Sequence, residues 1–341
     1  MDTELETRAR AAIGDVDRAL LVARDLGSRL PTPGQGRTRE RWSALAALGA
    51  GDLAVARTVE PHLDAIAILS ESAHPDLGEA AGRDATWGVF AAEGRGARLC
   101  AAPGPGHGPS APNGWRLDGT KPWCSLAEVL DRALVTAWID EDRRGLFAVS
   151  LRQPGVRVEA VPWVSHGLQT VRSPPTSYRS ADATLLGGPE WYLQRDGFAW
   201  GGIGVAAVWY GGAVGIARRL HRQSVDRELD QIGWAHLGTV DASLHAARAV
   251  LLESADLIDA GGARARAGEL LALRVRQVVV DAVELTIRAA DHALGPGPLA
   301  LEEEHAARVS DLRVYVRQHH AERDAAALGR AACGGGDASP W

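Results

Sequence analysis

The sequence predicts an α+β protein that is mostly helical, with a small β domain between two helical parts. Three observations carry this prediction. Apolar side chains recur at helical spacing at the start of the chain, short apolar runs broken by Gly, Pro and Asp follow from Thr86, and helical spacing returns after Gly197. With 341 residues, the chain is long enough for two or three packed units.

The N-terminal part, residues 1–85, is expected to be a helical domain. The segment Thr3–Leu26 places apolar side chains at helical spacing, and Leu53–Leu69 repeats the pattern. Between them, Leu30–Trp42 contains two prolines and two glycines, which predicts a turn-rich joint.

The middle part, residues 86–190, is expected to be an antiparallel β domain. The runs WGVFAAEG, ARLCAAP, RALVTAWID and GLFAVSL are each short enough for one strand, and turn residues separate them. Repeated short strands at this spacing are typical of an antiparallel barrel or sandwich and not of a parallel sheet.

The C-terminal part, residues 191–331, is expected to be an antiparallel four-helix bundle. The segments Leu237–Ile258 and Leu271–Ala289 carry apolar stripes with a 3.6-residue period, and a last stripe runs from Val309 to His319. Sustained amphipathic helices with short links favour a bundle. Residues 332–341 are predicted to be a flexible tail.

Composition excludes several classes of protein. The 37 basic and 43 acidic residues give a formal charge of −6, so no basic surplus exists to bind nucleic acid. Apolar runs such as Ile203–Tyr210 are shorter than the roughly 20 residues of a membrane span. Cys100, Cys124 and Cys333 show no metal-ligand spacing and fit a reducing cytoplasm, so we expect a cytoplasmic protein without a metal.

Four local motifs occur in order along the chain. They are GWRLDGTKPWCSLA, GVRVEAVPWVSHGLQTVRS, YGGAVGIARRL and ALGPGPLALEEEHAARVSDLRVY. Together with the helix, strand, helix order of the three parts, they resemble the acyl-CoA dehydrogenase family over nearly the whole chain. The resemblance implies that family's three-part fold, bound FAD, and a homodimer or homotetramer.

The first motif contains the predicted flavin contacts. On a strand, residues i and i+2 point the same way, so Trp123 and Ser125 can both face one flat ring. The resemblance implies that Trp123 packs near the flavin and that the Ser125 hydroxyl approaches its N5 atom. A core tryptophan beside a turn serine is the alternative. Lys121, the only lysine of the sequence, is expected to be a strand residue whose ammonium pairs locally.

Two loops of the family pattern are altered. The Thr-Glu-Pro flavin loop corresponds to Ala91–Arg98, where Glu93 remains as a cofactor-binding candidate but Ala92 replaces the hydroxyl. The loop that presents an arginine and a phenylalanine to a neighbouring subunit's flavin corresponds to Asp226–Gly233, which does not match. Fewer contacts to the cofactor's diphosphate are therefore expected.

The catalytic base of the family is also missing. At its two known places the sequence has Val205 followed by Ala206, and Gln318 followed by His319, so neither place carries a carboxylate. A neutral imidazole can accept a proton near pH 7, which makes His319 the catalytic candidate. A packed core histidine is the alternative. Flavin monooxygenases of the same fold have a histidine in the corresponding helix, and Glu322 could orient His319.

Two other motifs are weaker. Gly202-x-Gly204-x-x-Ala207 fits a dinucleotide fingerprint, but no β run precedes it and helical sequence follows, so close helix packing is preferred. Glu302-x-x-His305 resembles half of a di-iron site without a second half.

The sequence thus predicts a flavin-dependent oxidoreductase acting on an acyl-CoA or similar small acyl substrate by α,β-dehydrogenation, with an altered base. Two alternatives stay open: a non-catalytic paralogue or subunit that keeps the fold, and a monooxygenase of the same fold. Self-association is expected through the C-terminal bundle, because the Gly- and Ala-rich segment Gly201–Ala217 permits close helix approach.

Overall fold

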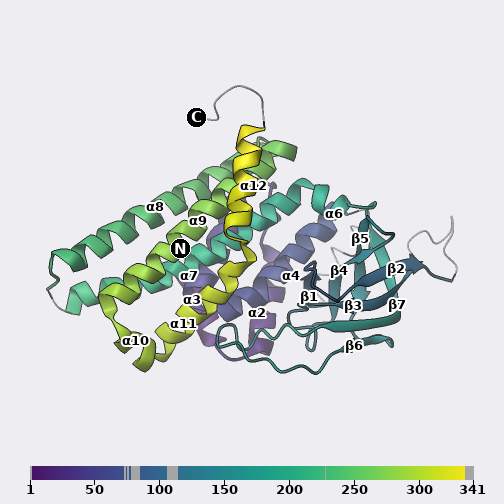
Figure 1. The fold of residues 1–341 in the computed structure, drawn as a ribbon, viewed down its shortest axis with the longest axis horizontal. Coiled ribbons are helices and arrows are strands. Elements are labelled where there is room, and N and C mark those ends of the chain that lie inside the picture. Colours follow the sequence, from purple (N-terminus) through teal and green to yellow (C-terminus); the bar gives the residue numbers. More distant parts are fainter. Residues whose placement is uncertain are drawn as a thin grey trace.

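The computed structural model describes residues 2–72, 74, 77, 85–105, 114–226 and 228–334. The N-terminal helices and the C-terminal bundle pack together on one side of the molecule, and the strands form a domain beside them (Figure 1). The helices are α1 (Thr3–Ala11), α2 (Val16–Arg29), α3 (Thr38–Gly51), α4 (Leu53–Glu71), α6 (Trp191–Gln194), α7 (Asp196–Asp226), α8 (Gln231–Asp259), α9 (Ala265–Leu294), α10 (Pro296–Leu301), α11 (Glu303–Tyr315) and α12 (Glu322–Cys333), with a 3₁₀ turn at Val316–Gln318.

The N-terminal helices differ from the prediction in two places. The first predicted helix is divided in two, because Gly14 adopts φ +76° and the side chain of Asp15 caps α2 by accepting the Arg18 N–H at 2.9 Å. The second half of the predicted joint is helix α3. Most of α3 is buried, so its sequence lacks the polar face that reveals a surface helix.

Helix α3 packs closely on α7, and glycines make this approach possible. A Cβ atom on Gly49 would lie 2.4 Å from the Val208 carbonyl oxygen, and one on Gly211 would lie 2.0 Å from the Ala46 carbonyl oxygen. The small residues of α7 therefore serve contacts within the chain. The predicted surface for self-association on α7 is thus partly occupied by α3 of the same chain.

The β domain is a closed ring of five strands, and two further strands pair with members of this ring. The strands are β1 (Trp87–Phe90), β2 (Leu99–Pro103), β3 (Gly114–Lys121), β4 (Arg132–Trp138), β5 (Arg144–Ser150), β6 (Val156–Val158) and β7 (Thr176–Leu186). The order β4-β2-β3-β7-β5 closes because β5 pairs back with β4, while β1 joins β4 and β6 joins β7. Pairing is not purely antiparallel as predicted, since β4 runs parallel to β1 and to β2. The long chain segments between these strands allow the parallel pairings.

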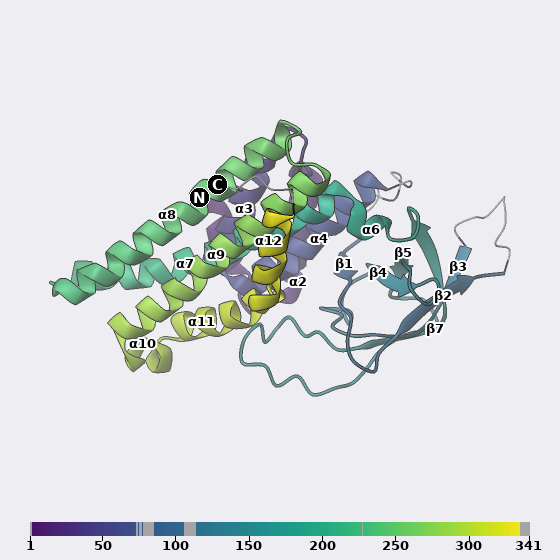
Figure 2. The same cartoon turned by 45° about the horizontal axis from the view of Figure 1, so that its top comes forward.

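The C-terminal part contains three long helices, α7 to α9, and α8 lies on the side away from the strands (Figure 2). The predicted stripes in α8 and α9 are confirmed as helices, but α11 ends at Tyr315, before His319. By length and composition alone α7 could cross a membrane, although its apolar runs predict no membrane span. However, 61% of its apolar window is buried inside the protein, as in a core helix. Of the predicted tail, only residues 332–334 lie within the described part of the chain.

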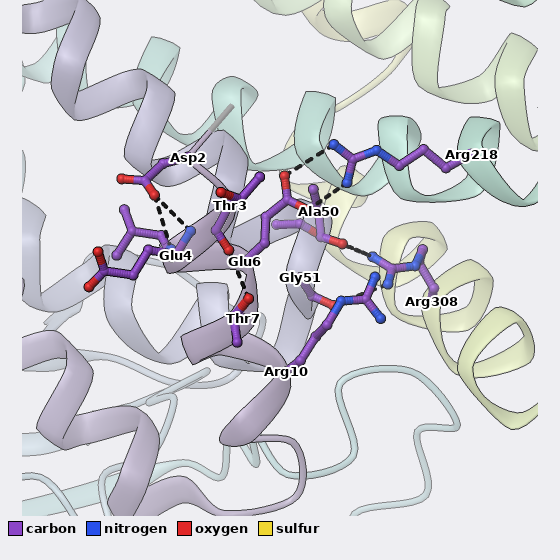
Figure 3. A network of polar contacts seen from close by, with 12 residues as sticks. Asp2, Thr3, Glu4, Glu6, Thr7, Arg10, Ala50, Gly51, Arg218 and Arg308 are labelled. Carbon is purple, nitrogen blue, oxygen red and sulfur yellow. Dashed lines mark hydrogen bonds and ion pairs between the residues drawn. The ribbon is translucent and has the colours of Figure 1, made fainter.

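Two arginines, buried Arg308 and exposed Arg218, tie the N-terminal helices to the bundle. The Arg308 guanidinium of α11 donates to the carbonyl oxygens of Gly49, Ala50 and Gly51, which are the last ones of α3 (Figure 3). Arg218 of α7 donates to the Glu6 carboxylate of α1 at 2.5 and 3.1 Å. A guanidinium at a helix C-terminus satisfies carbonyl groups that have no partner within the helix.

The β domain is fixed to the bundle through residues 159–175, which link β6 to β7. The Leu168 N–H donates to Asp311 Oδ1 of α11 at 2.6 Å, and Gly167 lies directly against the Ser310 carbonyl. The same segment also holds the turn after β3, since the Leu126 N–H donates to the Arg172 carbonyl at 2.8 Å. The region around Trp123 is therefore positioned by both the β domain and α11.

Candidate functional site

Lys121, the only lysine, is a buried structural residue. Its side chain is 1% exposed, and its ammonium donates to Glu93 Oε1 at 2.7 Å and to Thr136 Oγ1 at 2.8 Å. Burial lowers the pKa of Lys121, and the hydrogen bond and charge of Glu93 oppose that shift. The expected local pairing is confirmed. Glu93, a cofactor-binding candidate, is placed as the counter-ion of this lysine.

Trp123 and Ser125 lie beyond the end of β3, so the strand argument for their common direction was wrong. β3 ends at Lys121, and Trp123 has φ +59°, in the left-handed region. Both side chains nevertheless remain accessible. Trp123 is 60% exposed and Ser125 is half-buried, whereas Cys124 between them is fully buried.

An ion pair from α4 stands next to Ser125. The Ser125 hydroxyl lies 2.9 Å from that of Ser173 and 3.4 Å from Arg57 Nη2. Arg57 donates to Glu60 Oε2 at 3.1 Å, and the two side chains are only 15% and 10% exposed. The hydroxyl of buried Tyr315 donates to the same Glu60 oxygen at 3.1 Å. The carboxylate of Glu60 thus joins the turn after β3 to the end of α11.

Sequence reasoning missed this charged face of α4. Arg57, Glu60 and Asp64 are spaced three and four residues apart, which places them on one side of a helix. Burial raises the pKa of Glu60 and of Asp64, and nearby arginines oppose the shift in both cases. The available signal was ionisable residues at helical spacing within a helix that is otherwise apolar, since such residues need partners or a function when buried.

Arg276 of α9 extends the polar region toward the predicted base. Its guanidinium lies 4.8 Å from the ring centroid of Trp209 and donates to the Gly202 carbonyl at 3.0 Å and the Gln318 carbonyl at 3.1 Å. Trp209 in turn makes an edge contact with Tyr315 at 6.3 Å between ring centroids. A continuous set of contacts therefore runs from Ser125 through α4 to the residue before His319.

His319 faces inward as predicted, but from an extended segment and not from a helix. It is 3% exposed, with φ −91° and ψ 127°. Its Nδ1 accepts the Ala321 N–H at 3.2 Å, so the proton of the neutral ring belongs on Nε2, which lies 3.8 Å from Asp324 Oδ2. The carboxylate near the ring is Asp324, whereas Glu322 is exposed.

The electrostatic environment keeps the His319 ring neutral. Burial lowers its pKa, the charges of Arg276 and Arg317 add to the effect, and Asp324 opposes it. With Nδ1 occupied by a backbone N–H, the free ring atom is a donor, Nε2–H. This geometry suits an imidazole that donates a hydrogen bond better than one that accepts a substrate proton.

The other sequence candidates are placed as follows. Val205 and the glycines at Gly202 and Gly204 lie within α7, which follows helix α6 and not a strand, so the preference for close helix packing over a dinucleotide fingerprint is confirmed. Glu302 pairs with Arg219 at 2.6 Å, and His305 is buried beside it. Among the described residues, no group of three or more His, Cys, Asp or Glu side chains could hold a metal ion.

The residues around Trp123 fit a flat aromatic cofactor. The Trp123 indole is 60% exposed and offers a ring face, and the half-buried hydroxyl of Ser125 follows two residues later. The Lys121–Glu93 ion pair fixes the end of β3, directly before this turn. Trp123, Ser125 and Ser173 could hold such a ring by stacking and hydrogen bonding.

Comparison with known proteins shows the class to which this fold belongs. No family model matches the chain, and no curated protein matches its sequence. Its structure is nevertheless that of the acyl-CoA dehydrogenase fold, which is shared by dehydrogenases and monooxygenases. The predicted family resemblance is thereby confirmed at the level of the fold.

Three solved structures illustrate the likeness. FMN-bound TdsC, a dibenzothiophene monooxygenase from Paenibacillus sp. A11-2, has a TM-score of 0.80 at 17% identity and covers 99% of this chain and 98% of its own. Butyryl-CoA dehydrogenase from Megasphaera elsdenii has a TM-score of 0.78 at 15% identity, covering 96% and 97%. The nitrososynthase from Micromonospora carbonacea var. africana has a TM-score of 0.78 at 16% identity, covering 97% and 93%.

Proposed function

We propose that this chain is a flavin-dependent oxidoreductase that oxygenates a small substrate. The observation that carries the proposal is the protonation pattern of His319, whose Nδ1 accepts a backbone N–H and whose Nε2–H is left to donate. A buried donor can hydrogen-bond to an oxygen atom that gains electrons, whereas proton abstraction needs a free lone pair. The similarity to a monooxygenase of the same fold supports this choice.

The proposed flavin would supply the two-electron chemistry, and residues of this chain would position the reactants. Trp123 would stack on the ring, Ser125 would hydrogen-bond to its edge, and Arg57 would orient the Ser125 hydroxyl, from which it lies 3.4 Å. Glu93 would act through Lys121 by holding the turn. The family resemblance implies FAD, whereas TdsC was solved with FMN, so both flavins belong in the test.

The second candidate function is the predicted α,β-dehydrogenation of an acyl thioester. Glu60 favours it, since this carboxylate is buried, has a raised pKa and pairs with Arg57, which contacts Ser125. Such a group could accept a proton in place of the missing glutamate.

A flavin titration followed by two assays separates these functions. Uptake of FAD or FMN, seen as a shift of the flavin absorbance bands and absent in Trp123→Ala, is the result expected for either function. Anaerobic bleaching by butyryl-CoA would support the dehydrogenase. Oxygen consumption with chemically reduced flavin, stimulated by indole, would support the oxygenase; indole is a bound ligand of TdsC. Protein that takes up neither flavin is the non-catalytic paralogue.

We also propose a homodimer or homotetramer in the cytoplasm. The three cysteines are free, in keeping with a reducing compartment. Large apolar side chains are exposed where α7 ends and α8 begins, namely Val225, Ile232 and Trp234, and they are a better candidate interface than the glycines of α7. Light scattering at micromolar concentration that gives a monomer mass would contradict this proposal.

A further inference from the structure

A cavity lies between helix α9 and the end of α11, outside the candidate flavin site. It has a volume of about 390 Å³, which is enough for a small molecule. The side chains that line it are Glu284, Ile287, Arg288, Asp291, His292, Arg313, Val316 and Arg317. Neither Trp123 nor Ser125 is among them, so the proposed function leaves this cavity, which we term the α9–α11 cavity, without a role.

The α9–α11 cavity has an apolar interior and a charged rim. Its α9 residues recur at three- and four-residue spacing from Glu284 to His292, which places them on one face of the helix. Ile287 and Val316 are 7% and 1% exposed, so the lining is apolar where it is buried. The three arginines and Glu284 are exposed. A ligand that fits this arrangement has an apolar body and one polar or charged end.

Two ion pairs join the walls of the cavity and use both of its carboxylates. Arg313 Nη2 lies 2.7 Å from Asp291 Oδ2, and Arg317 pairs with Glu284. In each pair the carboxylate comes from α9 and the arginine from α11 or the 3₁₀ turn that follows it. The negative charge of both carboxylates is thereby balanced.

Arg288 is the third arginine of the rim, and it gives the cavity its charge. It follows Glu284 by one helical turn, and among the described residues it makes no hydrogen bond or ion pair. Three arginines and two carboxylates leave one positive charge in the lining, whereas the formal charge of the whole protein is −6. Water solvates the exposed guanidinium in the free protein. A ligand carboxylate can replace that water, because a planar guanidinium donates two parallel hydrogen bonds to a carboxylate.

We propose that the α9–α11 cavity binds a small carboxylate with an apolar body, such as a short-chain fatty acid. The carboxylate pairs with Arg288, and the apolar body covers Ile287 and Val316. A monoanion neutralises the single positive charge of the lining, whereas a cation is repelled by it. Pairing with the guanidinium and burial of apolar surface both contribute, so the site favours the whole acid over either of its parts. This site goes beyond the proposed oxidoreductase function and does not depend on it.

Calorimetry with hexanoate tests the proposal, with hexanamide and acetate as matched probes. Hexanamide keeps the apolar body without the charge, and acetate keeps the charge without most of the body. We expect wild-type protein to bind hexanoate at least about tenfold more tightly than either matched probe. No binding of hexanoate up to millimolar concentration, or equal affinity for hexanoate and hexanamide, would overturn the proposal.

Variants of exposed arginines locate the bound acid without disturbing the core. Arg288→Gln should weaken hexanoate binding by about tenfold or more. Arg288→Glu makes the net charge of the lining negative and should bind hexylammonium in preference to hexanoate. Arg274→Gln is the matched control, since Arg274 is an exposed arginine of α9 that does not line the cavity. A hexanoate affinity that is unchanged in Arg288→Gln, or equally reduced in Arg274→Gln, would contradict the proposed site.

Trp123→Ala separates this site from the candidate flavin site. The variant should bind hexanoate as the wild type does, because Trp123 does not line the cavity. Hexanoate binding that is lost in Trp123→Ala but kept in Arg288→Gln would place the acid in the candidate flavin site and overturn the proposal. If the protein takes up no flavin but binds hexanoate through Arg288, the oxidoreductase proposal fails and the α9–α11 site stands.

Discussion

Lys121 and Arg57 are both buried cations near the candidate site, and they differ in how their surroundings use them. Lys121 is enclosed by Glu93 and Thr136 within the β domain, so its pairing is complete. Arg57 pairs with Glu60 but also reaches Ser125 and Tyr315. A polar group whose hydrogen bonds are all made within one domain contributes to the fold. A polar group that contacts residues of the candidate site is also available for a ligand.

The largest expected effect concerns His319, the residue directly after the end of the contacts that begin at Ser125. If the proposed oxygenation is correct, His319→Ala should lower kcat by about 10²- to 10⁴-fold, since a positioned proton donor is worth that much. His319→Asn should retain activity to within about tenfold, because its amide can still donate a hydrogen bond. Steady-state kinetics with flavin occupancy measured in parallel checks both variants.

The two roles of His319 also differ in their pH dependence. The pKa of His319 is lowered from 6.5 by burial, so a base would lose activity only as the pH falls through that lowered value. A donor keeps its Nε2–H on both sides of this pKa and gives no ascending limb from His319. An ascending limb that disappears in His319→Asn, together with loss of activity in that variant, would assign the base role and contradict the donor role.

The second prediction concerns the buried ion pair of Lys121 with Glu93. Lys121→Met should lower the free energy of unfolding by about 3 kcal/mol, because it removes the buried donor of Thr136 and leaves Glu93 with only Arg144, at 3.8 Å. Chemical denaturation measures this loss. Arg143→Met, which removes an exposed pair with Asp140, is the control and should lose much less stability than Lys121→Met. Equal losses in the two variants would show that the Lys121 pair is no more structural than a surface pair.

The third prediction concerns Asp311, which joins the β domain to α11. Burial raises its pKa from 3.8 to about 6, so the folded state holds this proton more tightly than the unfolded state does. The contribution of this shift to stability is complete below pH 3.8 and is lost as the pH rises through about 6, a loss of roughly 3 kcal/mol.

Asp311→Asn should remove this pH dependence while its amide oxygen still accepts the Leu168 N–H. Relative to wild type, the variant should gain stability as the pH rises from 4 to 7 in urea unfolding experiments. A constant difference across that range would mean that Asp311 titrates normally.

The smallest expected effect on stability is at Trp123. Because its side chain is 60% exposed, Trp123→Ala should change the free energy of unfolding by at most about 0.5 kcal/mol. Flavin affinity should nevertheless fall, since the ring face is lost. A large loss of stability with unchanged flavin affinity would show that Trp123 is a structural residue, as Lys121 is.

The sequence predicted much of the fold because periodic apolar residues report local structure directly. The helices of the C-terminal part and the strands after Thr86 were found in this way, and so was the inward position of His319. Helix α3 was missed because its buried residues show no periodic contrast. The parallel pairing of β1 with β4 was missed because register between distant strands is set by tertiary packing.

The sequence by itself determined the order of the parts, the resemblance to acyl-CoA dehydrogenases and the absence of a carboxylate at Val205 and Gln318. Only the tertiary structure decided that Glu93 pairs with Lys121 and that Asp324 is the carboxylate near His319. The physical reason is that hydrogen bonds and desolvation depend on distances between residues far apart in the chain. Residue type and spacing cannot specify those distances.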